Sequence, residues 1–198
     1  MILYSFRRCP YAIRARLALK LANVNYKTIE IDLKSKDPDF LKISKKGTVP
    51  VLVLNNKIII EQSIKIMFWA FQNNNLKHLI SYKQDEQIRL IDYTEQYFKK
   101  YLDAFKYCPK EKIAQKKQSR EKAEFYLMKL EKLLRKNKFL YCSKAILSDY
   151  AILPFIRQYF FSDFSYSKNR EFYYLYTWME RLINSNLFLE VMEKKLKN

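Results

Sequence analysis

Glycine is almost missing from this sequence, which contains a single glycine, Gly47, among 198 residues. Histidine also occurs once, as His78, and cysteine only three times. A lone histidine and three scattered cysteines do not supply the clustered ligands of a zinc site. Three cysteines far apart in the chain do not make a disulfide framework either. We therefore expect no metal site, and thiols in the reduced state typical of the cytoplasm.

Long apolar runs are missing as well, although apolar residues make up 49% of the chain. No uncharged apolar stretch reaches the roughly 18 residues that would indicate a transmembrane helix. The first residues enter a predicted strand at once, without the pattern of a signal peptide. The sequence therefore predicts no membrane span and a cytoplasmic location, while its apolar content is sufficient for a folded core.

Acidic residues are scarce relative to basic ones, and the formal net charge is +18. One interpretation is attraction to a polyanion, either nucleic acid or an acidic protein. The other is a general bias of composition, because Lys, Asn, Ile, Tyr and Phe are all abundant while glycine is nearly absent. The charge is spread along the chain and forms no basic tail, which favours the second interpretation.

Cys9 stands at the start of the most informative stretch. Residues 2–6 are mostly apolar and predict a strand. Apolar residues then recur every fourth position from Ile13 to Leu21, which is the spacing of one helix face. Proline is favoured at the first helical position, so Pro10 indicates where the helix begins. Cys9 is then the N-cap, where free backbone N–H groups and the positive end of the helix dipole face its side chain.

This position suits a reactive thiol, since only the thiolate is nucleophilic. With an ordinary pKa of about 8.5, roughly 3% of a thiol is ionised at pH 7. If the helix end and Arg7, Arg8 and Arg14 lower the pKa of Cys9 to about 7, roughly half is ionised. The alternative is a small cysteine that merely packs beside a strand end.

The run Arg-Arg-Cys-Pro-Tyr-Ala-Ile-Arg-Ala-Arg-Leu-Ala-Leu (residues 7–19) resembles the opening of cysteine-type glutathione transferases, especially the omega class and the glutaredoxins of that fold. The resemblance implies a thioredoxin-like α/β domain over 1–74, a linker over 75–83, and an all-helical domain over 84–198. The pattern of 1–74 agrees: strand, helix, strand, helix, a hairpin whose turn is Asn55-Asn56, and a last helix.

The resemblance also assigns a glutathione site. In Gly47-Thr48-Val49-Pro50 it implies a cis bond before Pro50, with the backbone N–H and C=O of Val49 holding the cysteinyl part of glutathione like a strand edge. Thr48 belongs to the same motif. Pro10 and Tyr11 are expected to line the site beside Cys9.

Two further positions complete the implied site. Gln62 and Ser63 match the family's motif at a helix start and are assigned to the γ-glutamyl end, where free N–H groups assist carboxylate binding. A plain helix cap is the alternative. The spacing of Lys36 matches that of a lysine in omega-like enzymes that contacts the glycine carboxylate of glutathione. The alternative is a solvated lysine without a ligand.

Ala12 occupies the place of a second, resolving cysteine, so an external thiol is required. The resemblance therefore implies a monothiol transferase: Cys9 takes a glutathionyl group from a disulfide, and a second glutathione removes it. Two alternatives stay open. One is conjugation of glutathione to a small electrophile, with Tyr4 or Ser5 as activating group. The other is a non-catalytic protein that binds RNA polymerase or another polyanionic partner. A homodimer is compatible with each.

In the second part of the chain, helical spacing predicts one long helix from Gln84 to before Pro109, another over 113–136, and later segments over 172–183 and 187–196. Asp149 sits where the family has a capping box, but Ile146 replaces the Ser or Thr. We expect Asp149 alone to satisfy the turn. Cys108 and Cys142 lack a helix-start context and are interpreted as structural.

Overall fold

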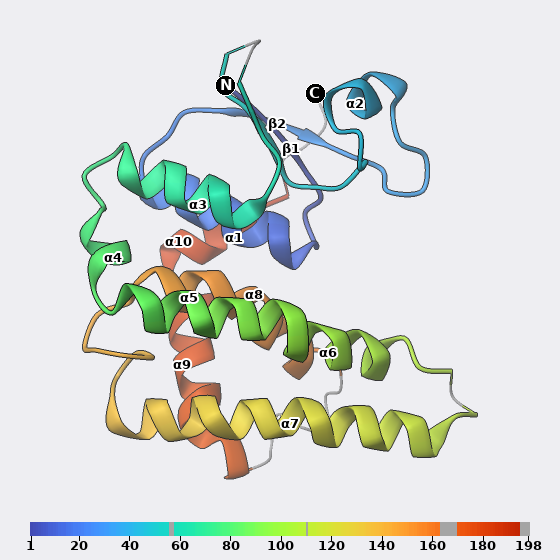
Figure 1. Cartoon of the computed structure of the whole chain (residues 1–198), viewed down its shortest axis with the longest axis vertical. Coiled ribbons are helices and arrows are strands. Elements are labelled where there is room, and N and C mark those ends of the chain that lie inside the picture. The colour runs from blue at the N-terminus through green and yellow to red at the C-terminus, as the bar shows by residue number, and fades with distance from the viewer. Residues whose placement is uncertain (56–57, 110, 163–169, 195–198) are drawn as a thin grey trace. The chain divides into compact units, whose positions relative to one another are not determined.

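The structure is a computed structural model that describes residues 1–55, 58–109, 111–162 and 170–194 (Figure 1). By packing, the chain forms two compact units. The first combines Met1–Ser81 with Ser185–Asn198, and the second is Tyr82–Asn184. The domain boundaries drawn from the sequence stay a prediction. No helix in the described ranges is long and apolar enough to cross a membrane.

The first unit contains a four-stranded mixed sheet in the order β2-β1-β3-β4. Strands β1 (Ile2–Ser5) and β2 (Lys27–Glu30) are parallel, and β3 (Val51–Val53) is antiparallel both to β1 and to β4 (Ile59–Ile60). This is the thioredoxin-like arrangement expected from the sequence. Asn56 of the predicted tight turn, and residue 57 after it, lie outside the described residues.

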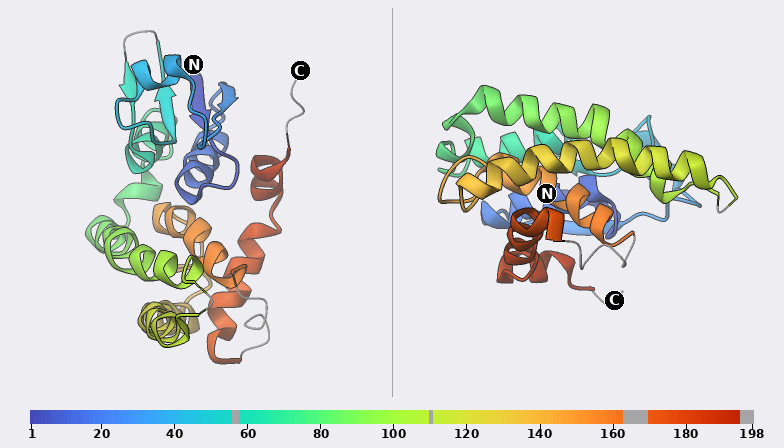
Figure 2. Two further views of the ribbon diagram at one scale, coloured as in Figure 1. Left: turned by 90° about the vertical axis from the view of Figure 1, so that its right-hand side faces the viewer. Right: turned by 90° about the horizontal axis from the view of Figure 1, so that it is seen from below.

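Helix α1 (Pro10–Leu21) is the crossover between the parallel strands, and both α3 (Ser63–Gln72) and α10 (Asn186–Met192) pack against it (Figures 1 and 2). Side chains alternate along β1. Ser5 accordingly faces α1, where Arg16 donates a hydrogen bond to it. The Tyr4 ring lies 5.3 Å from the ring of Phe40, a residue of α2 (Pro38–Ile43). Of the expected helix over 187–196, residues 195 and 196 lie outside the described ranges.

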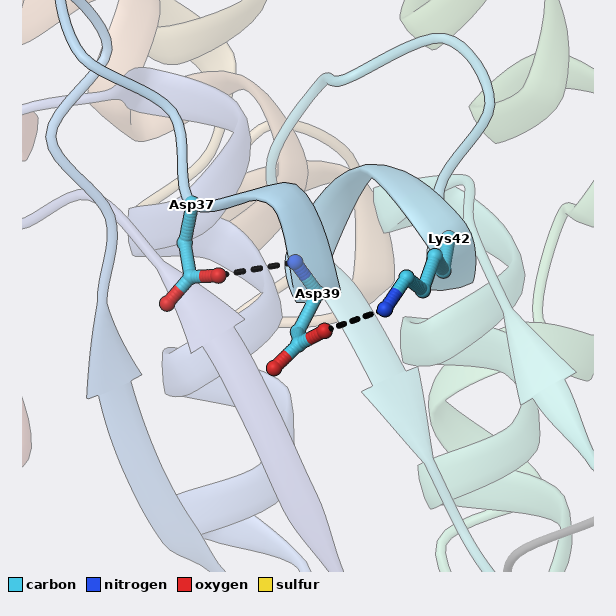
Figure 3. Close-up of polar contacts among 3 residues, drawn as sticks. All are labelled: Asp37, Asp39 and Lys42. Atoms are coloured by element: carbon cyan, nitrogen blue, oxygen red, sulfur yellow. Dashed lines mark hydrogen bonds and ion pairs between the residues drawn. The ribbon is translucent and has the colours of Figure 1, made fainter.

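Helix α2 (Pro38–Ile43) follows a capped turn (Figure 3). The Asp37 carboxylate accepts the N–H of Asp39 at 2.7 Å, and Pro38 occupies the first helical position. Asp39 in turn pairs with Lys42 at 2.7 Å. The cap satisfies a backbone donor that the helix itself leaves open, so it fixes where α2 begins and where the chain before it runs. A short helix, α4 (His78–Ser81), ends this part of the unit.

The second unit is helical, with α5 (Gln84–Tyr93), a π-helical turn (Thr94–Phe98), α6 (Lys99–Lys106), α7 (Ile113–Lys136), α8 (Leu147–Phe160), a 3₁₀ turn (Arg170–Phe172) and α9 (Tyr173–Ile183). The helix expected from Gln84 onward is thus interrupted by the π turn. There the Thr94 hydroxyl donates to the Leu90 carbonyl at 2.8 Å. A threonine hydroxyl that bonds the carbonyl four residues earlier competes with the backbone N–H for that carbonyl. Helices often deform at such a position.

Asp149 ties three segments of this second unit together. Its carboxylate accepts the N–H of Ile146 at 3.0 Å, confirming that Asp149 satisfies the turn in place of a complete capping box. It also accepts the Leu140 N–H at 3.0 Å and the Trp178 indole N–H at 2.8 Å. Asp149 is fully buried, and this burial raises the pKa of its carboxyl group to about 6 although the hydrogen bonds oppose the rise.

Candidate functional site

Cys9 is the N-cap of α1, as the sequence predicted. Its backbone is extended (φ −72°, ψ 123°), and Pro10 is the first helical residue. The Cys9 N–H donates to the Phe6 carbonyl at 3.0 Å, and its own carbonyl accepts the Ile13 N–H at 2.9 Å. The side chain is half-buried, and the first turn of α1 carries no acidic residue that would offset the positive helix end.

The Gly47–Pro50 loop meets Cys9. The Val49–Pro50 peptide bond is cis, as expected from the motif. The Cys9 Sγ lies 3.9 Å from the Val49 carbonyl oxygen, and Cys9 packs against the apolar cluster that includes Val49 and Phe40. Residues 40 positions apart therefore converge, and the thiol lies beside backbone groups of the kind that pair with an extended peptide.

Gly47 and Lys36 lie together at the entry to this loop. Gly47 has φ +58°, a left-handed backbone that favours glycine. A Cβ on Gly47 would be only 3.0 Å from Leu41 Cδ2 and 3.2 Å from Lys36 Nζ. The Lys36 ammonium therefore lies over Gly47, next in the chain to Thr48, which is exposed. Lys36 precedes the Asp37 cap of α2, which holds this part of the chain.

The Gln62-Ser63 pair lies at the start of α3. Gln62 is its exposed N-cap, and Ser63 is its first residue and is buried. The Ser63 hydroxyl accepts a hydrogen bond of 2.9 Å from Nε of Arg14, a buried residue of α1. The Arg14 guanidinium also lies 5.2 Å from the centre of the Tyr11 ring. Arg14 thus links the helix that carries Cys9 to the helix that carries Ser63.

Arg16 is a residue to which the sequence assigned no role. Its side chain is only 6% exposed and donates to the Ser5 hydroxyl at 2.6 Å and to the Arg7 carbonyl at 2.8 Å. Burial lowers the pKa of its guanidinium, while nearby Tyr26, Glu30 and Cys9 act in the opposite direction. The sequence alone gives no signal for this role, because the helix is buried on all sides over residues 12–19, and Arg14 is buried there as well.

Ser5 and the other two cysteines are further residues that the sequence analysis singled out. Ser5, an alternative activating group, is fully buried and its hydroxyl is engaged by Arg16. Cys108 and Cys142 are half-buried thiols whose Sγ atoms contact the carbonyls of Lys112 and Lys144 at 3.5 and 3.1 Å. The described part of the chain contains no group of three or more His, Cys, Asp or Glu side chains placed to hold a metal ion.

Two family descriptions together match most of the chain. Residues 3–78 match the family described as glutathione S-transferase, N-terminal domain, and residues 63–186 match glutathione S-transferase, C-terminal domain. Glutathione S-transferase omega-2 of Mus musculus is 37% identical over 62 residues, which make up 31% of this chain and 25% of that protein. The matched stretch therefore covers only a quarter of the length of the mouse relative.

Solved structures of glutathione transferases match the backbone fold over nearly the whole chain. Glutathione transferase URE2P6 from Phanerochaete chrysosporium, in complex with oxidized glutathione, superposes with a TM-score of 0.84 at 20% identity, over 96% of this chain and 93% of that one. Glutathione transferase Omega 3C from Trametes versicolor gives 0.79 at 17% identity, over 98% and 90%. At these identities the likeness establishes the fold, while the family rests on the matches to its two domains. On those matches, the chain belongs to the glutathione S-transferase family.

Proposed function

We propose that this protein is a glutathione-dependent thiol transferase that uses the Cys9 thiolate as its only protein nucleophile. The observation that carries the proposal is the place of the Cys9 Sγ, at the N-terminus of α1 and 3.9 Å from the Val49 carbonyl oxygen. The omega-class relative and the fold neighbour in complex with oxidized glutathione support glutathione as the co-substrate.

Glutathione would bind across the surface that these loops form. The Val49 backbone pairs with its cysteinyl residue and brings the sulfur toward Cys9. Gln62, Ser63 and the open N–H groups of α3 receive the γ-glutamyl carboxylate. Lys36, whose ammonium lies over Gly47, receives the glycine carboxylate of glutathione. Thr48, which follows Gly47 in the chain, receives the glutathione backbone next to that carboxylate. Pro10 and Tyr11 border the thiol.

The chemistry proceeds by two thiol–disulfide exchanges. The Cys9 thiolate attacks the glutathionyl sulfur of a mixed disulfide; a Cys9–glutathione disulfide forms, and the other thiol leaves as a thiolate that takes a proton from water. A glutathione thiolate then attacks the glutathionyl sulfur on Cys9. Oxidised glutathione leaves and the Cys9 thiolate is restored. Because Ala12 stands where a second cysteine would be, the second step requires the external thiol.

Two assays on the unmodified protein test this proposal. We expect reduction of a small mixed disulfide by glutathione, followed through formation of oxidised glutathione, to be much faster than conjugation of glutathione to an aryl halide. Thiol exchange needs a nucleophilic cysteine, whereas conjugation needs only an activated glutathione. Conjugation as the faster reaction would contradict the proposal and favour the second enzymatic alternative. Absence of both activities would favour a binding protein.

A further inference from the structure

The peptide of Arg7 is held on both sides by charged groups. Its N–H donates to the Glu30 carboxylate at 2.6 Å, and its carbonyl accepts from the buried Arg16 guanidinium at 2.8 Å. Arg16 also bonds Ser5, the last residue of β1, at 2.6 Å. One buried cation therefore bonds two points of the segment from Ser5 to Cys9, which connects the sheet to the nucleophile.

Burying that cation is costly, which calls for an explanation. Removing a charge from water is costly unless the charge is well paired, and buried ion pairs can often be replaced by apolar residues of similar volume without loss of stability. The Arg16 Nε has no hydrogen-bond partner among the described residues. Its pairing is thus incomplete, and the burial is more readily explained by something the charge does than by stability.

We propose that Arg16 is a positioning residue for Cys9, holding the Ser5–Cys9 segment in place and supplying a buried positive charge that favours the Cys9 thiolate. The proposal rests on the proposed role of Cys9 as nucleophile. Cys9 and Arg16 interact electrostatically, and this interaction is mutual: a thiolate stabilises the guanidinium, so the guanidinium stabilises the thiolate.

Helix α10 covers the same guanidinium. The Met192 Sδ lies 3.8 Å from Arg16 Nη2, and the Met192 carbonyl accepts from the Arg7 side chain at 3.4 Å. Lys20 of α1 pairs with Glu190 of α10 at 2.6 Å. Residues near the end of the chain therefore help to exclude water from Arg16, and an ion shielded from water is little affected by salt.

Other neighbours act on the same groups. Arg16 interacts electrostatically with Tyr26 and Glu30 from the β2 side and with Arg7 and Cys9 from the loop. Glu30 opposes the effect of Arg16 on a thiolate, and the Val49 carbonyl, as an acceptor for the thiol, favours the protonated form. Because these groups act in opposite directions, the effect of Arg16 on the ionisation of Cys9 is isolated by replacing Arg16 alone.

The test is the rate of alkylation of Cys9 by iodoacetamide as a function of pH, in protein free of glutathione. The extent of modification is followed by mass spectrometry on the peptide that contains Cys9. In Arg16→Met we expect the midpoint of the profile to rise by about one pH unit, so that alkylation at pH values below both midpoints slows about tenfold. Arg16→Lys, which keeps the charge but not the fork of donors, should move the midpoint by less than half as much.

Arg8→Gln is the matched control. The sequence suggested Arg8 as one of the cations that lower the pKa of Cys9, but its side chain is exposed, and water and salt screen an exposed charge. Its midpoint should therefore stay within about 0.2 units of the unmodified protein. An unchanged midpoint in folded Arg16→Met would overturn the proposal, because a purely structural arginine alters stability and not thiol ionisation. If that variant does not fold, the midpoint of Cys9 alkylation is measured instead in the unmodified protein at about 0.05 M and about 1 M salt. A midpoint that is the same at both salt concentrations supports stabilisation of the thiolate by a buried cation. A midpoint that rises with salt assigns that stabilisation to surface charges and overturns the proposal.

This readout is separate from the proposed enzymatic function. Alkylation reports the ionisation of Cys9 whether or not the protein reduces disulfides. A protein without transferase activity but with the Arg16-dependent midpoint would contradict the function alone. A protein with transferase activity whose alkylation midpoint does not change when Arg16 is replaced would contradict the positioning role alone.

Discussion

Cys9→Ser is expected to abolish the reduction of disulfides by glutathione, lowering kcat/KM by at least about a thousandfold. The serine hydroxyl fits the N-cap, so the fold is kept, but it is not ionised near neutral pH and cannot form the disulfide intermediate. The measurement is the rate of oxidised glutathione formation, coupled to glutathione reductase, with a small mixed disulfide as substrate.

Cys108→Ser and Cys142→Ser are the matched controls for that variant. Both thiols are half-buried like Cys9, yet neither lies at a helix N-cap. We expect their rates to stay within about twofold of the unmodified protein. A Cys9→Ser variant with an unchanged rate, or a Cys142→Ser variant that loses it, would show that another thiol or no thiol carries the reaction.

The second large effect concerns stability. Asp149→Ala is expected to lower the free energy of unfolding by about 3–5 kcal/mol, because three buried donors lose their acceptor. These donors are the backbone N–H groups of Leu140 and Ile146 and the indole N–H of Trp178. No water reaches them to replace the carboxylate, since Asp149 is fully buried and Trp178 is 1% exposed. Urea unfolding followed by Trp fluorescence measures the change.

Asp149→Asn is the control, and it also isolates a pH effect. Burial raises the pKa of Asp149 from 3.8 to about 6, so the folded state holds this proton more tightly than the unfolded state. The stability gained from the proton is complete below about pH 4 and is lost as the pH rises through about 6, up to roughly 3 kcal/mol. The amide side chain of the Asp149→Asn variant does not titrate, so its unfolding free energy should fall less between about pH 4 and pH 7. Equal pH dependence in both proteins would contradict this assignment.

The features predicted correctly from the sequence depend on short stretches of chain. Pro10 and the apolar spacing after it indicate a helix start, which places Cys9 at the N-cap. The cis bond before Pro50 was implied by the resemblance of the Gly47–Pro50 motif to the family, and not by local physical reasoning. The strands at the start of the chain follow from alternation and turn residues. These signals are local, because capping and periodicity act over a few residues.

The features that the sequence did not predict depend on contacts between distant residues. The acceptor role of Asp149 toward Ile146 is local and was expected, whereas its bonds to Leu140 and Trp178 depend on how helices pack. Arg16 looks like an ordinary helical arginine until Ser5, Arg7 and Met192 enclose it. The return of the segment after Asn184 to the unit formed by the first part of the chain likewise has no local signal.

The most direct test of the account is to identify which cysteine accepts glutathione. The unmodified protein is incubated with oxidised glutathione, quenched with acid and digested, and its three cysteine peptides are compared by mass spectrometry. We expect a glutathionyl adduct on Cys9 that excess reduced glutathione removes, with Cys108 and Cys142 unmodified. An adduct on Cys108 or Cys142 with Cys9 unmodified would contradict the claim that the thiol at the start of α1 is the nucleophile.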